Sequence, residues 1–131
     1  MQNRFKKVML IDDDEIDLKI NSKLISLAKI FDEIVICHSG VEALRYLNNE
    51  LDQKEFTPIF ILLDIQMPEM NGFDFLLHYR ELSKSIINNC LIAMLSSTLD
   101  FGDIKKAEAN PHVVKLLKKP LAINELLTIL K

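Results

Sequence analysis

Acidic side chains follow two of the apolar runs in this sequence. Asp12, Asp13 and Asp14 come directly after VMLI, and Asp64 comes directly after IFILL. A buried carboxylate is costly unless a partner compensates its charge. Asp64 therefore lies either at the surface or at a site where its charge is used.

Hydroxyl and ammonium groups follow two further apolar runs. CLIAML is followed by Ser96, Ser97 and Thr98, and HVVKLL is followed by Lys118, Lys119 and Pro120. A carboxylate can attack a phosphoryl group to form an aspartyl phosphate, and that transfer needs positioning and positive charge. In this interpretation Asp64 is the nucleophile, Lys119 supplies positive charge, and the Ser96 hydroxyl donates to a phosphoryl oxygen.

Clustered carboxylates need a counter-charge. Two of them about 4 Å apart repel by about 4 kcal/mol at an effective dielectric near 20, whereas a whole domain is stable by only ~5–15 kcal/mol. An all-oxygen site without His or Cys favours Mg²⁺ or Mn²⁺ over Zn²⁺. The predicted metal ligands are Asp13, Asp12 through water, Asp64, and the backbone carbonyl of Gln66.

Each of these residues also has a purely structural interpretation. The three aspartates are compatible with a solvated turn that caps a helix, because acids favour helix N-termini. Asp64 alone fits a turn, each serine fits a helix cap, and Lys119 fits a surface charge. The hypothesis of a shared site depends on complementary groups after four separate runs.

Five apolar runs define the predicted strands. They are Lys7–Ile11, Glu33–Cys37, Ile59–Leu63, Cys90–Leu95 and His112–Leu117. Most are continuous, which is typical of parallel strands covered on both faces. Alternation with helices and right-handed crossovers favours an open, doubly wound α/β sheet, in which ligands bind beyond the carboxyl ends of the strands.

Helical patterns fill the gaps between the runs. The spacing of Ile16, Ile20, Leu24 and Leu27 predicts the first helix. Leu44, Leu47 and Leu51 predict the second, which begins at a capping box formed by Ser39 and Glu42. Later helices are predicted over Phe73–Leu82, Asp100–Ala109 and Leu121–Leu130, and a surface loop over Asn48–Thr57.

Composition narrows the function classes. The chain has 131 residues and a formal net charge of -3, which argues against a basic nucleic-acid-binding surface. No apolar run approaches the ~20 residues of a membrane helix, and the first run is too short for a signal peptide. Cys37 and Cys90 lack metal-ligand spacing and are expected to be reduced core thiols. We expect a cytoplasmic protein with no nucleic-acid or membrane partner.

Four motifs together resemble the receiver domains of two-component response regulators. They are VMLIDDDE, ILLDIQMPEMNG, IAMLSS and KKP, and the resemblance extends from Lys7 to Leu130. It implies a (βα)5 flavodoxin-like fold with a parallel five-stranded sheet in the order 2-1-3-4-5, as in chemotaxis receivers. It also leads us to expect a single receiver domain over residues 1–131 without an output domain.

The resemblance assigns a role to each candidate residue. Asp64 matches the phosphoacceptor, Asp12 and Asp13 the metal-binding pair, Gln66 the main-chain metal ligand, Ser96 the switch hydroxyl, and Lys119 the lysine whose bond to Pro120 is cis. The implied cofactor is Mg²⁺ or Mn²⁺, and the implied donor is a sensor histidine kinase or a histidine phosphotransfer protein. The domain would catalyse its own phosphorylation and dephosphorylation, with no turnover of an external substrate.

The implied output is a phosphorylation-dependent binding surface for a downstream protein. We expect the segment Thr98–Pro111 to change, together with the last strand and helix. Two residues depart from the family pattern: Leu116 replaces the usual Tyr or Phe, and Ser97 replaces the usual Ala or Gly. Leu116 argues against an aromatic switch, and the larger Ser97 side chain is expected to narrow access to the phosphoryl group.

Alternatives remain open at this point. The chain can be an interaction module that keeps the fold but is never phosphorylated. A haloacid-dehalogenase-like phosphatase is disfavoured, because those enzymes carry a second acid where this chain has Gln66. Within the receiver interpretation, both a phosphorelay intermediate and a terminal effector fit the residues.

Overall fold

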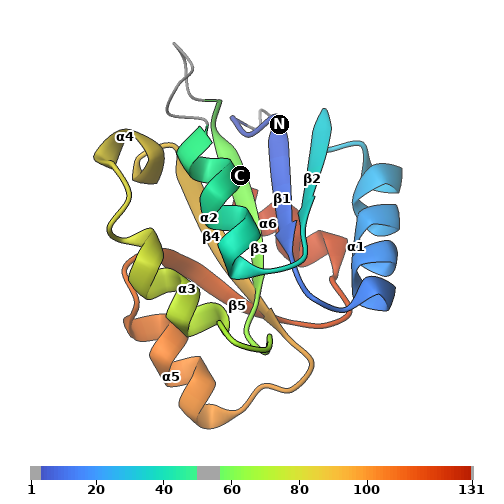
Figure 1. The fold of residues 1–131 in the computed structure, drawn as a ribbon. Helices are drawn as coiled ribbons and strands as arrows, with labels where there is room; N and C mark the ends of the chain where they lie inside the picture. Colours follow the sequence, from blue (N-terminus) through green and yellow to red (C-terminus); the bar gives the residue numbers. More distant parts are fainter. Residues whose placement is uncertain (1–3, 50–56, 131) are drawn as a thin grey trace.

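Five parallel strands form the centre of the structure, in the order β2-β1-β3-β4-β5 (Figure 1). The computed structural model describes residues 4–49 and 57–130. The strands are β1 (Lys7–Ile11), β2 (Glu33–Cys37), β3 (Ile59–Asp64), β4 (Cys90–Ser96) and β5 (Val113–Lys118). The predicted doubly wound α/β class, the flavodoxin-like fold and the strand order are all confirmed.

The helices cover the two faces of the sheet. They are α1 (Glu15–Ala28), α2 (Gly40–Asn49), α3 (Gly72–Tyr79), α4 (Lys84–Ile87), α5 (Phe101–Ala109) and α6 (Ile123–Leu130). The apolar faces of α1 and α6 pack on one side, where Leu18 and Leu126 join Leu62 in one core cluster. The helices α2 to α5 cover the other side, where Leu47 and Phe75 join a second cluster.

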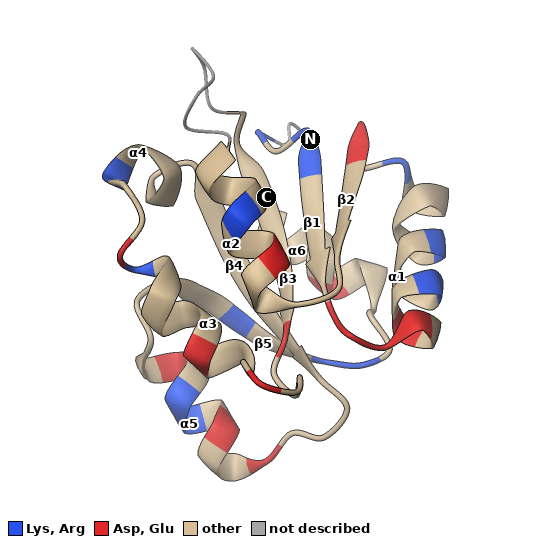
Figure 2. Ribbon diagram, viewed as in Figure 1, with Lys and Arg blue, Asp and Glu red and all other residues tan. Residues whose placement is uncertain are grey.

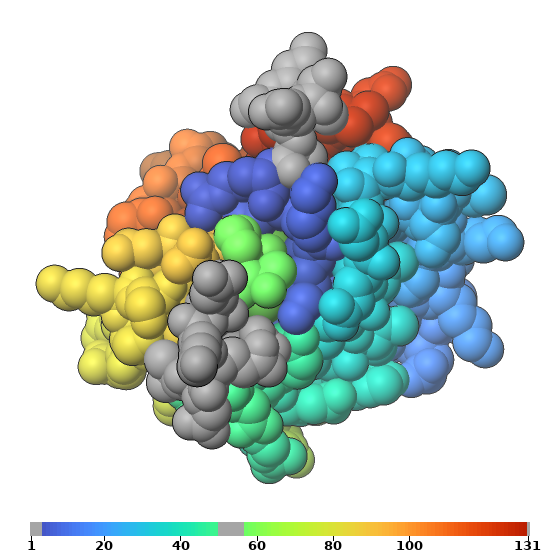
Figure 3. Space-filling model, turned by 90° about the horizontal axis from the view of Figure 1, so that it is seen from above, coloured from blue at the N-terminus to red at the C-terminus, as the bar shows by residue number. Residues whose placement is uncertain are grey.

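The central strands are buried and the edge strands are not. All residues of β1 and β3 are buried, because each strand has a neighbour on both sides and helices on both faces. In β2 and β5, Ile36 is 41% exposed and Val114 is 48% exposed. Burial on both faces was therefore a wrong prediction for these two strands, which each have a free edge. Figure 3 shows the end of the molecule at which the strands begin.

The first helix is present, but of the four apolar residues that predicted it only Leu24 packs against the core. Ile16, Ile20 and Leu27 are 69%, 44% and 66% exposed. The buried residues of α1 are Leu18, Asn21 and Ile25, which also recur at helical spacing. Because apolar residues occur all around this helix, periodicity alone could not identify the buried face.

Other boundaries differ by a few residues. The third helix ends at Tyr79 rather than Leu82, and a short unpredicted helix, α4, follows with Ser83 as its N-cap. The second helix extends to Asn49, so the predicted loop does not begin at Asn48; the rest of that loop, with Leu51, lies almost entirely outside the described residues. Ser39 accepts a hydrogen bond from the Glu42 N–H at 3.1 Å, as the capping box predicts. The Glu42 carboxylate instead accepts from the His38 N–H.

The Asn-Gly pair after β3 starts a helix that presses against the strand end. Asn71 and Asp74 form a capping box. The Gly72 N–H donates to the Ile65 carbonyl at 2.7 Å, and a Cβ at Gly72 would lie 2.7 Å from the Asp64 carbonyl oxygen. A side chain there would push the backbone of Asp64 away, so this glycine fixes the end of β3.

Within the described ranges, none of the helices has both the length and the apolar character needed to cross a membrane.

Candidate functional site

Parallel pairing places two aspartates side by side. Ile11 pairs with Leu63, so Asp12 and Asp64 occupy the next position on neighbouring strands. The Asp12 N–H still donates to the Cys37 carbonyl at 3.1 Å, which keeps Asp12 in line with β1. Both aspartates are only 4% exposed. Figure 2 shows acidic segments where β1 and β3 end.

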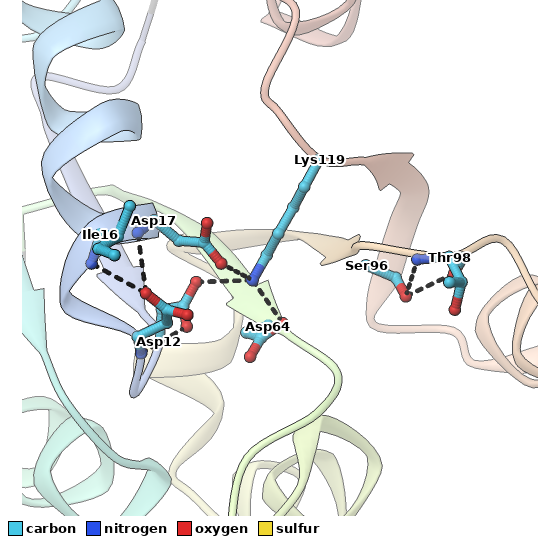
Figure 4. A network of polar contacts seen from close by, with 8 residues as sticks. Asp12, Ile16, Asp17, Asp64, Ser96, Thr98 and Lys119 are labelled. Carbon is cyan, nitrogen blue, oxygen red and sulfur yellow. Dashed lines mark hydrogen bonds and ion pairs between the residues drawn. The ribbon is translucent and has the colours of Figure 1, made fainter.

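Lys119 approaches the same point from the end of β5. Its N–H donates to the Ser96 carbonyl at 2.8 Å, and its bond to Pro120 is cis, as the resemblance implied. Its Nζ lies 2.9 Å from Asp12 Oδ2, 2.9 Å from Asp17 Oδ2 and 3.0 Å from Asp64 Oδ1 (Figure 4). An ammonium group has three donors, so each of its N–H groups has a carboxylate to bind.

The three consecutive aspartates have different positions. Asp12 is buried in the cluster and Asp13 is exposed beside it. Asp14 is the N-cap of α1, where its side chain accepts hydrogen bonds from the N–H groups of Ile16 and Asp17. The helix-capping interpretation of these acids is thus confirmed for Asp14.

Asp12, Asp13 and Asp64 form a group that could hold a metal ion. One oxygen of each lies within 4.8 Å of the others. The cavity around them has a volume of about 550 Å³, and Gln66 and Ser97 line it as well. Three carboxylates without a nitrogen or sulfur ligand suit a hard cation such as Mg²⁺.

Burial and charge shift the pKa of Asp64 upward. Desolvation is the main cause, hydrogen bonding to Lys119 opposes it, and the charge of Asp12 adds to it; together they raise the pKa to about 6. Burial acts to lower the pKa of Lys119, but its hydrogen bonds to Asp12, Asp17 and Asp64 more than offset this, so its pKa is raised. The lysine is therefore charged, and the acids carry an excess of negative charge.

Ser96 lies next to the cluster but its hydroxyl points away from it. The Ser96 Oγ donates to the Thr98 carbonyl at 2.5 Å and accepts from the Thr98 N–H at 3.3 Å. Figure 4 shows this pair apart from the carboxylates around Lys119. Of the predicted site residues, Asp12, Asp13, Asp64, Gln66 and Lys119 line one cavity, whereas Ser96 does not.

Asp17 is a member of the cluster that the sequence analysis missed. It lies in the first turn of α1, and its side chain is 33% exposed. Asp17 is the third residue of the helix that Asp14 caps. An acid at that position is typical of helix capping, so nothing in the sequence placed it in a functional site. Only the orientation of α1 shows that this carboxylate faces Lys119.

The sequence profile of the family described as response regulator receiver domain matches residues 8–131. The chain belongs to this family. Receiver domains of solved structure share its fold. A response regulator receiver protein from Dyadobacter fermentans is 34% identical, with a TM-score of 0.84 over 95% of this chain and 94% of that chain. A two component response regulator from Cytophaga hutchinsonii is 32% identical, with a TM-score of 0.88 over 96% of this chain and 94% of that chain.

Curated relatives carry this receiver domain within longer proteins. Hybrid signal transduction histidine kinase B from Dictyostelium discoideum is 30% identical over 95% of this chain. An uncharacterised response regulatory protein from Staphylococcus epidermidis is 31% identical over 88% of this chain. The chain spans 6% of the length of the first protein and 41% of the second.

The raised pKa predicts that the charge of Asp64 destabilises the metal-free fold. Above about pH 6 the folded state holds an ionised carboxylate that it disfavours, and below the ordinary value of 3.8 this cost is absent. Asp64→Asn should therefore raise the free energy of unfolding at pH 7 by about 1–3 kcal/mol in chelator. This gain should vanish near pH 4, as measured by urea unfolding.

Asp13→Asn is the matched control, because it removes an exposed carboxylate from the same cluster. We expect it to change the free energy of unfolding by less than about 0.5 kcal/mol. A metal-free Asp64→Asn variant that is less stable than the wild-type protein at pH 7 would contradict this account.

Proposed function

We propose that this receiver domain accepts a phosphoryl group onto Asp64 in a reaction that depends on Mg²⁺ or Mn²⁺. The donor is a phosphohistidine of a sensor histidine kinase or a histidine phosphotransfer protein, and the reaction takes place in the cytoplasm. The observation that carries this proposal is the convergence of Asp12, Asp13, Asp64 and Lys119 on one cavity. Membership of the receiver family supports it.

The chemistry follows from the arrangement of these groups. An oxygen of the Asp64 carboxylate attacks phosphorus, the new P–O bond forms an acyl phosphate, and the P–N bond breaks with its electron pair returning to the imidazole. Asp12, Asp13, Asp64 and the Gln66 carbonyl are the groups proposed to hold the cation, which when bound neutralises charge on the phosphoryl oxygens. Lys119, 3.0 Å from Asp64, supplies a second positive contact.

The surface beside the cavity suits a helical donor. Ile16 lines the cavity and is 69% exposed, and Ile20 follows one turn later at 44% exposed. Exposed apolar side chains on one helix face are typical of protein contact sites. We propose that the donor protein packs on this face of α1, with its phosphohistidine above Asp64.

The alternative is a receiver-like interaction module that is never phosphorylated. Such a module would not need a complete set of these groups. Yet Asp64, the pair Asp12 and Asp13, and Lys119 are all present, and Lys119 bonds to Asp12 and Asp64. A phosphorelay intermediate and a terminal effector would both use the same Asp64 chemistry.

The signal is proposed to leave through the segment after β4. The Ser96 hydroxyl is bonded to the backbone of Thr98, and Leu99 and Phe101 follow with 46% and 71% exposure. Turning the hydroxyl toward a phosphoryl group on Asp64 would break both bonds to Thr98 and release this segment. Leu116 packs against the core instead of offering an aromatic ring, so the proposed switch works through the Thr98–Phe101 backbone.

Phosphorylation is testable with a small-molecule phosphodonor. The wild-type protein should gain the mass of one phosphoryl group in Mg²⁺ but not in chelator. Without a bound cation, the carboxylates of the site repel the negatively charged phosphoryl group of the donor. Asp64→Asn should not be labelled, since it keeps the shape of the acceptor but lacks the nucleophile. Intact mass spectrometry measures both. Equal labelling of Asp64→Asn would contradict Asp64 as the acceptor, whereas no labelling of the wild-type protein under conditions that label a known receiver would favour the interaction module.

The switch is testable by backbone NMR on the phosphorylated protein. In the wild-type protein, phosphorylation should shift the amide signals of residues 98–104, since the bonds to Thr98 are lost. Ser96→Ala should still be phosphorylated but lose most of these shifts, whereas Ser97→Ala should keep them. Full shifts over this segment in Ser96→Ala would rule out the hydroxyl as the link.

A further inference from the structure

Asp17 binds the ammonium group of Lys119 from outside the proposed metal site. Its Oδ2 lies 2.9 Å from Nζ, as close as Asp12 Oδ2. Among the described residues, the acids whose oxygens converge for a metal are Asp12, Asp13 and Asp64, and Asp17 is not one of them. The lysine thus has two partners that the cation also needs and one that the cation does not.

The Asp17 carboxylate is available for this contact because the helix start does not use it. A third-position acid in a capping box reaches back to the N–H of the N-cap residue. Here the N-cap N–H, that of Asp14, donates to Asp12 Oδ1 at 3.0 Å. The Asp14 side chain in turn binds the Asp17 N–H at 3.2 Å and fixes the first turn of α1. Asp17 is therefore held in place through its backbone while its carboxylate faces Lys119.

A bound cation would compete with the ammonium group for the same carboxylates. Lys119 is bound to both Asp12 and Asp64, and its side chain is only 10% exposed. A divalent cation held by those carboxylates would weaken this bonding and repel the ammonium charge. A buried ammonium group left without a partner is strongly disfavoured, so Lys119 needs another carboxylate when the cation enters.

We propose that Asp17 is a positioning residue that keeps Lys119 bonded when a divalent cation takes Asp12 and Asp64, and thereby raises the affinity of the site for that cation. This inference rests on the proposed Mg²⁺ site. It gives α1 a direct effect on the phosphorylation chemistry, in addition to its proposed role as a contact surface. Since Asp17 is one-third exposed, its replacement by Asn should not unfold the chain.

The test is the Mg²⁺ affinity of the unphosphorylated protein, measured from amide shifts in an NMR titration. Asp17→Asn should bind Mg²⁺ about tenfold more weakly than the wild-type protein, with unchanged unfolding in chelator. Asp17→Glu, which keeps the charge on a longer side chain, should recover most of the affinity. The matched control is Glu15→Gln, which removes another acid that lines the cavity but pairs with His38 instead of Lys119.

Asp17→Asn removes both a negative charge and a contact to Lys119, and two comparisons between variants separate these effects. If Asp17 acts only through its charge, Asp17→Asn and Glu15→Gln will weaken binding equally, and Asp17→Asn will have the same effect in a Lys119→Met background. If Asp17 acts through Lys119, its effect will exceed that of Glu15→Gln and will largely disappear in that background. Equal effects overturn the inference while the metal site stands, whereas a wild-type protein that binds no Mg²⁺ here overturns the proposed metal chemistry and this inference with it.

Discussion

One ammonium group holds the functional end of this domain together. Lys119 Nζ binds carboxylates from the end of β1, the first turn of α1 and the end of β3. Without that charge, the side chains of Asp12 and Asp64 would meet at a buried point with nothing to offset their repulsion. One positive charge faces several carboxylates at this point, so the cluster keeps an excess of negative charge. The excess negative charge favours the binding of a divalent cation.

The rest of the fold serves to bring these groups to one place. Parallel pairing of β1 with β3 sets Asp12 beside Asp64, and pairing of β4 with β5 carries Lys119 to the same edge. Gly72 lets α3 start directly against the Asp64 carbonyl, which fixes the strand end from below. On the far side, Ser96 connects the site to the Thr98–Phe101 segment through two hydrogen bonds. In the proposed switch, the Ser96 side chain turns from this segment toward Asp64 when the charge there changes.

Much of this arrangement was predictable from the sequence. Continuous apolar runs located the strands to within about a residue, and the rule that ligands bind at the carboxyl ends of parallel strands brought Asp12, Asp64 and Lys119 together. Periodicity could not show which face of α1 is buried, because apolar residues occur all around this helix. For this reason the spacing of Ile16 and Ile20 located the helix but not its buried face, and the carboxylate of Asp17 was not recognised. The direction of the Ser96 hydroxyl was equally inaccessible, because a rotamer depends on contacts that no sequence pattern encodes.

The central claim is that the acids at this sheet edge form a site for a hard divalent cation. Diffraction from crystals grown with Mn²⁺ tests it most directly, because the anomalous signal of manganese locates the ion without reference to the surrounding density. The account predicts one strong peak within bonding distance of the carboxylates of Asp13 and Asp64, with the Gln66 carbonyl as a further ligand. No peak at this position at saturating Mn²⁺, or a peak bound only by surface acids elsewhere, would contradict it.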